Sequence, residues 1–75
     1  MSQASELYKN EIIRAEIDRQ RNMAEIAVNE AIIEELSGND SKIKYSKKLE
    51  YRNSDLEYQN KVLHQFQLNL KKLRS

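Results

Sequence analysis

One short segment divides this chain into two halves. Residues 37–41 read SGNDS and hold the only glycine, Gly38, of a 75-residue chain that has no proline. Glycine readily takes the left-handed backbone conformation that ends many helices, and Asn, Asp or Ser can cap the helix that follows. Both flanking segments are rich in helix-forming residues. We therefore expect a single all-α domain with helices at about 3–36 and 42–73, joined by a loop at 37–41.

Apolar residues recur at steps of three and four in both segments, the spacing of a coiled-coil contact face. In the second segment a leucine stands at every seventh position. In the first segment the pattern is interrupted by polar residues. The predicted contact face of the second helix is Tyr45, Leu49, Arg52, Leu56, Gln59, Leu63, Phe66, Leu70 and Leu73. That of the first helix is Tyr8, Ile12, Ala15, Arg19, Asn22, Ile26, Asn29, Ile33 and Leu36.

The two faces predict an antiparallel helical hairpin if the chain reverses near residue 39. Residues whose numbers sum to about 78 then lie opposite one another, which places Arg19 and Gln59 in one polar layer and Glu25 beside Asp55 as like charges. Pairing of the leucines between molecules, as in a zipper, is the alternative. Agreement of loop position, helix length and period favours the hairpin.

The first helix carries more apolar residues than a hairpin can cover. A chain of this size seldom buries enough apolar surface to be stable alone, and with no cysteine it has no disulfide. We therefore expect a second interface that binds another copy of the chain, giving a four-helix bundle or coiled coil, or that binds a helical hetero-partner. Its predicted residues are Ile13, Ile17, Ala24, Ala27, Val28, Ala31 and Ile32, with Tyr51, Tyr58 and Val62 at the edge.

Charge suggests a second kind of partner. Residues 1–40 carry nine acidic and four basic side chains, whereas residues 41–75 carry three acidic and nine basic ones. Lysines near exposed tyrosines can bind phosphates while the rings stack on unpaired bases. The overall charge of +1 weakens such a field, so nucleic acid is the less favoured partner. The predicted nucleic-acid face is Lys44, Lys47, Lys48, Tyr51, Tyr58 and Lys61.

Other functions lack their sequence signals. There is no glycine-rich phosphate loop, no cysteine nucleophile and no Glu-x-x-His metal motif, and His64 stands alone. We expect no enzymatic activity, cofactor, metal or small-molecule substrate. The chain has neither a signal peptide pattern nor an apolar run long enough to cross a membrane, so we expect a cytoplasmic protein that does not bind membranes. The predicted function is that of a small adaptor, assembly factor or chaperone-like subunit.

Overall fold

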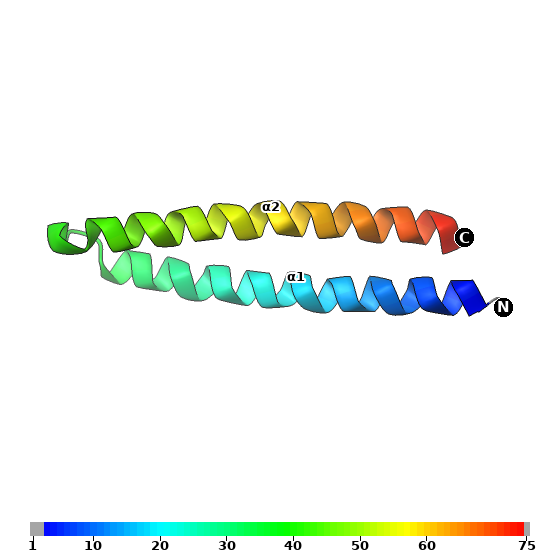
Figure 1. Cartoon of the computed structure of the whole chain (residues 1–75). Helices are drawn as coiled ribbons and strands as arrows, with labels where there is room; N and C mark the ends of the chain where they lie inside the picture. Colours follow the sequence, from blue (N-terminus) through cyan, green and yellow to red (C-terminus); the bar gives the residue numbers. More distant parts are fainter. Residues whose placement is uncertain (1–2, 75) are drawn as a thin grey trace.

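The computed structural model describes residues 3–74 and shows two long helices lying side by side in opposite directions (Figure 1). Helix α1 spans Gln3–Glu35, a 3-10 turn η1 spans Asp40–Lys42, and helix α2 spans Ile43–Arg74. The hairpin measures 58 × 14 × 11 Å between its Cα atoms. The start of α1 and the end of α2 lie at the same end of the rod, and the connection lies at the other end (Figure 1). The expected all-helical hairpin is confirmed.

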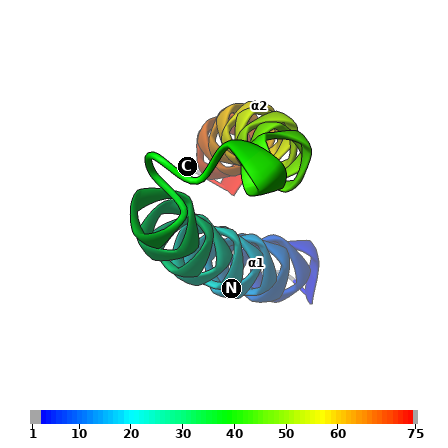
Figure 2. The ribbon, with the colours of Figure 1, turned by 90° about the vertical axis from the view of Figure 1, so that its left-hand side faces the viewer.

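The connection is built from the residue types that end and start helices. Gly38 has a φ of 84°, a left-handed conformation that suits a residue without Cβ. The Asn39 side chain then accepts hydrogen bonds from the backbone N–H and the hydroxyl of Ser41, at 3.2 and 2.7 Å, which caps η1. The 3-10 turn leads directly into α2, which begins at Ile43. Figure 2 shows this connection crossing between the helix ends.

The face of α1 that meets α2 follows the expected spacing. We call it the inner face of α1, and its residues are Tyr8, Ile12, Ala15, Arg19, Asn22, Ile26, Asn29, Ile33 and Leu36. The contact face of α2 differs from the expected one. The four leucines remain, but the positions between them are one residue later than predicted, and Tyr45, Phe66 and Leu73 are exposed. The observed inner face of α2 is Ser46, Leu49, Asn53, Leu56, Asn60, Leu63, Gln67 and Leu70.

The pairing of the helices is also displaced from the expected one. Asn29 contacts Asn53, and Asn22 contacts Asn60, so facing residues have numbers that sum to 82 instead of 78. This difference moves one helix along the other by four residues, or about 6 Å at the rise of an α-helix. The point of reversal is accordingly near residue 41 instead of residue 39, within the 3-10 turn at Asp40–Lys42.

The buried interior is half polar. Among the described residues, the buried apolar side chains are Ala15, Leu56 and Leu70, and Leu56 is the most enclosed with 1 % of its surface exposed. The remaining buried side chains are amides: Asn29, Asn53 and Gln67. Burial of so few apolar groups contributes little hydrophobic stabilisation. Among the described residues, amides thus make up as much of the buried interior as apolar side chains do.

Candidate protein and nucleic-acid interfaces

Amide pairs join the inner faces at two points one heptad apart. Asn29 Nδ2 donates to Asn53 Oδ1 at 2.9 Å, and both side chains are buried. Asn22 Nδ2 donates to Asn60 Oδ1 at 2.8 Å. A buried amide without a partner is costly, so each asparagine favours the arrangement in which it faces the other. The two pairs thus specify how α1 and α2 meet.

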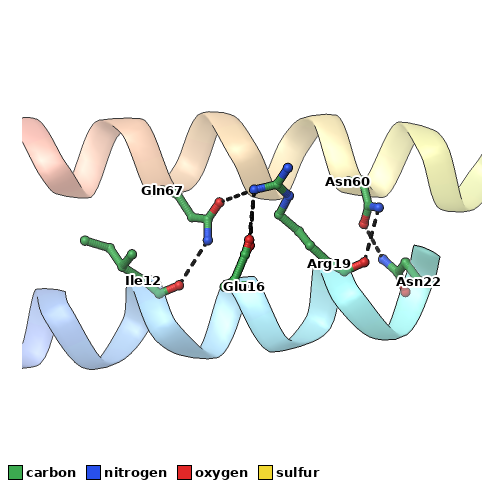
Figure 3. A network of polar contacts seen from close by, with 6 residues as sticks. All are labelled: Ile12, Glu16, Arg19, Asn22, Asn60 and Gln67. Carbon is green, nitrogen blue, oxygen red and sulfur yellow. Dashed lines mark hydrogen bonds and ion pairs between the residues drawn. The ribbon is translucent and has the colours of Figure 1, made fainter. Parts of the chain in front are cut away.

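A wider polar network continues toward the open end of the hairpin (Figure 3). Arg19 reaches from α1 toward α2 and donates from Nη1 to Gln67 Oε1 at 2.8 Å, while Glu16 accepts from the same nitrogen at 3.3 Å. Gln67 Nε2 in turn donates to the backbone carbonyl of Ile12 at 3.1 Å. Asn60 Nδ2 likewise donates to the backbone carbonyl of Arg19 at 3.4 Å. This bond is the same kind of contact as that of Gln67 with Ile12, one heptad away along each helix. These bonds hold the backbone of α1 against α2.

The predicted layer of Arg19 with Gln59 is therefore wrong. Gln59 lies on the exposed side of α2 and donates to Asp55 within its own helix at 3.1 Å. The polar partners of α1 that the expected pairing missed are Asn53, Asn60 and Gln67. The signal was present: asparagines stand seven residues apart in both halves of the chain, at 22 and 29 and at 53 and 60.

An ion pair closes one flank of the hairpin. Arg52 donates to both carboxylate oxygens of Glu25, at 2.6 and 3.2 Å, and lies 3.9 Å from Asp55 on its other side. The expected repulsion between Glu25 and Asp55 is thus relieved by the guanidinium between them. The hydrogen bond from Arg52, with its positive charge, lowers the pKa of Glu25 below its ordinary value of 4.5. Both side chains remain about half exposed, so solvent screens the pair.

The surplus apolar residues of α1 lie on its solvent side, away from α2. Ile13 and Ile17 are each 49 % exposed, and a shallow depression of about 480 Å³ lies over them and Ala24. The neighbouring Val28 is also exposed, whereas Ile32 is half-buried at the flank of the hairpin. We call the stripe at steps of three and four the outer face of α1: Ile13, Ile17, Gln20, Ala24, Ala27 and Ala31.

The residues predicted as an edge of that interface do not all lie together. Tyr51 and Tyr58 are 79 % and 67 % exposed. Tyr58 and Val62 line one groove between the helices with Asp18 and Arg21 of α1, and Arg21 also borders the depression over Ile13 and Ile17. Tyr51 lies farther along α2, beside Lys47 and Glu50.

Most of the predicted nucleic-acid face lies along one side of α2, in line with Tyr51 and Tyr58. Steps of three and four place three of the predicted lysines and both tyrosines in one line along the helix. Lys48 is exposed but falls on the neighbouring flank. We call this line the Lys/Tyr stripe: Lys44, Lys47, Tyr51, Ser54, Tyr58 and Lys61.

Two further properties concern residues 3–74. Within this part of the chain, no three or more His, Cys, Asp or Glu side chains gather in a way that could hold a metal ion. Neither of the two helices described is long and apolar enough to cross a membrane.

Comparison with known proteins gives no relative for this chain: no family model, curated protein or solved structure matches it.

Proposed function

We propose that this hairpin is a non-enzymatic protein that acts by binding other protein chains, and that it self-associates through the outer face of α1. The adaptor, assembly or chaperone-like roles share this physical requirement: an amphipathic helix presented to another helix. The self-associated form contains four helices, two from each copy.

One observation carries the proposal: apolar side chains are concentrated outside the hairpin. The described part of the chain buries three apolar residues but exposes thirteen large ones. Isolated exposed apolar residues are ordinary, whereas a continuous stripe along a helix is typical of a contact surface. The outer face of α1 is such a stripe, because Ile13, Ile17 and three alanines follow one line over about five turns.

Sedimentation of the purified chain over a range of concentrations tests the proposal. The native chain is expected to sediment as a dimer, and the variant with Ala27→Glu and Ala31→Glu as a monomer, because charge on both alanines disfavours close helix contact. Ser54→Glu is the matched control, since Ser54 is exposed on the opposite side of the hairpin. A native chain that remains monomeric at all concentrations contradicts self-association. Loss of the dimer in the Ser54 variant would place the interface on α2 instead.

A second candidate function rests on the Lys/Tyr stripe. Tyr51 and Tyr58 are the two most exposed large apolar residues described, and they share one line with Lys47 and Lys61. Aromatic rings and lysines arranged in this way suit a single-stranded nucleic acid. The test is binding of a labelled single strand over a salt series, which should give a steep salt dependence and should fail in a Tyr51→Ala, Tyr58→Ala variant. Salt-independent or absent binding removes this candidate.

A further inference from the structure

The outer face of α1 is asymmetric in side-chain size. Its N-terminal part presents the large side chains Ile13 and Ile17, and its C-terminal part presents the small side chains Ala27 and Ala31. A helix surface of this kind is complementary to a copy of itself running in the opposite direction, where each isoleucine meets an alanine. Two copies running in the same direction would instead place isoleucine against isoleucine and leave gaps between the alanines.

The charges that flank the outer face have the same asymmetry. Lys9, Arg14 and Arg21 flank its N-terminal part together with one acid, the half-buried Glu16, whereas Glu30 and Glu35 flank its C-terminal part. All of these side chains except Glu16 are exposed. Arg14 makes a 3.7 Å contact with Glu11 one turn away, a surface pair that constrains the arginine little. Opposite charges meet between two copies only when the copies are antiparallel.

We infer that two copies of the hairpin bind through the outer faces of their α1 helices as an antiparallel two-fold pair, in which facing residues have numbers that sum to 44. This inference rests on the proposed self-association. In that pairing Ile13 lies opposite Ala31 of the second copy, and Ile17 lies opposite Ala27 of the second copy. Gln20 lies opposite Ala24, and the two-fold axis passes near residue 22.

The flanking charges favour this pairing over the two antiparallel pairings that are displaced from it by one heptad. By the geometry of antiparallel helix pairs, Lys9 lies beside Glu30 of the second copy and Arg14 beside Glu35 of the second copy. The two-fold axis repeats both contacts, giving four ion pairs between the copies. A slip of one heptad in one direction would oppose Glu16 to Glu30 and Arg21 to Glu35, so that repulsions offset attractions. A slip in the other direction would oppose Glu16 to Glu16 and Arg21 to Arg21. Neither alternative matches the four attractions of the proposed pairing.

The overlap is long enough for a stable contact. Residues 9–35 of each α1 fall within the pairing, which corresponds to about 40 Å of helix at 1.5 Å per residue. The depression over Ile13, Ile17 and Ala24 lies inside this region and faces the alanines of the second copy. Close approach is favoured by the alanines, whose small side chains allow the backbones to come near.

Disulfide trapping tests the relative direction of the two α1 helices. Any disulfide must form between the introduced cysteines, because the native chain has none. Two single variants, Ile17→Cys and Ala27→Cys, are oxidised separately and as an equimolar mixture, and products are separated without reductant. The antiparallel pairing predicts a disulfide only in the mixture, since residue 17 of one copy faces residue 27 of the other. Cross-linking of either variant alone would show a parallel pair and overturn the inference. A dimer with no cross-link in any sample would place the interface elsewhere and also overturn it.

Charge exchange gives a second test that does not alter the apolar contacts. Variant Lys9→Glu, Arg14→Glu and variant Glu30→Lys, Glu35→Lys should each dimerise at least about tenfold more weakly than the native chain, because four attractions become repulsions. An equimolar mixture of the two variants should recover the lost affinity as a heterodimer. Equal affinity of all three samples would contradict the inference while leaving self-association intact. A native chain that is monomeric fails the proposed function itself, so the two failures are distinguishable.

Discussion

The inner and outer faces of α1 differ in where they place polar side chains. The inner face places Arg19, Asn22 and Asn29 against α2, and the outer face presents Ile13 and Ile17 to solvent. Polar groups in a contact face favour one arrangement because misalignment leaves them without partners, and apolar groups contribute burial energy with less directional preference. The inner face therefore determines how the chain folds back, and the outer face leaves apolar surface exposed to solvent. The predictions below test this division.

The largest effect is expected from Leu56→Ala. Leu56 is the most enclosed side chain described, and truncation of a buried leucine costs about 2–5 kcal/mol. A hairpin of this size has little more stability than that, so the variant should be largely unfolded by circular dichroism at room temperature. Leu73→Ala is the control, because Leu73 is 66 % exposed and its truncation should leave the melting curve nearly unchanged. Equal effects of both substitutions would contradict the observed inner face of α2.

A smaller effect is expected from the amide pair. Asn29→Leu leaves Asn53 buried without its partner, which costs about 1–3 kcal/mol of unfolding free energy. The double variant Asn29→Leu, Asn53→Leu should be at least as stable as the native chain, since apolar residues replace both members. Chemical denaturation of the native chain, the two single variants Asn29→Leu and Asn53→Leu, and the double variant gives the coupling between the two positions. If the two single substitutions are simply additive, the asparagines do not act as a pair.

Substitution on the outer face should change the unfolding of the monomer little. Ile13→Ser and Ile17→Ser remove side chains that are half exposed and lie away from α2. At concentrations where the chain is monomeric, we expect a change in unfolding free energy of about 0.5 kcal/mol or less. At higher concentrations the native chain should melt at a higher temperature than the variant, because only the native chain gains stability from association. A loss in the monomer as large as that of Leu56→Ala would mean that the outer face belongs to the core.

The smallest effect concerns the ion pair between Glu25 and Arg52. The pKa of Glu25 is lowered in the folded chain, so the pair stabilises the fold above pH 4.5, and this stabilisation is lost as the pH falls through the folded pKa. Arg52→Gln should therefore lower the melting temperature slightly at pH 7, and the difference from the native chain should shrink below pH 4.5. Arg14→Gln is the control on an exposed pair within α1. A difference that stays constant down to pH 2 would exclude this pair as its source.

Sequence pattern was sufficient for the hairpin but not for its pairing. The break at Gly38 and the seven-residue leucine spacing predict two helices, and the inner face of α1 follows the pattern as expected. On α2 the aromatic residues Tyr45 and Phe66 offered a more apolar stripe than the amides beside them. The spacing of apolar residues therefore predicts that stripe as the contact face, because this spacing is determined for each helix separately. The amide pairs are a property of both helices together, since Asn53 is a favourable inner residue only when Asn29 lies opposite.

The same limit applies to the predicted surfaces. Periodicity identified Ile13 and Ile17 as surplus, and their exposure in the structure agrees with that interpretation. Spacing at steps of three and four predicts one edge formed by Tyr51, Tyr58 and Val62, but spacing does not show which of them lies near the other helix. In the structure Tyr58 lines a groove with residues of α1, whereas Tyr51 lies among residues of α2 alone.

The inner and outer faces of α1 lie about 150° apart around the helix axis, given 3.6 residues per turn. A second hairpin bound on the outer face therefore extends the molecule sideways, into a nearly flat row of helices ordered α2, α1, α1 and α2. In the proposed dimer, each end of the row carries a Lys/Tyr stripe, where Lys47 and Tyr51 lie beside Glu50. The two stripes of such a dimer are identical and face in opposite directions.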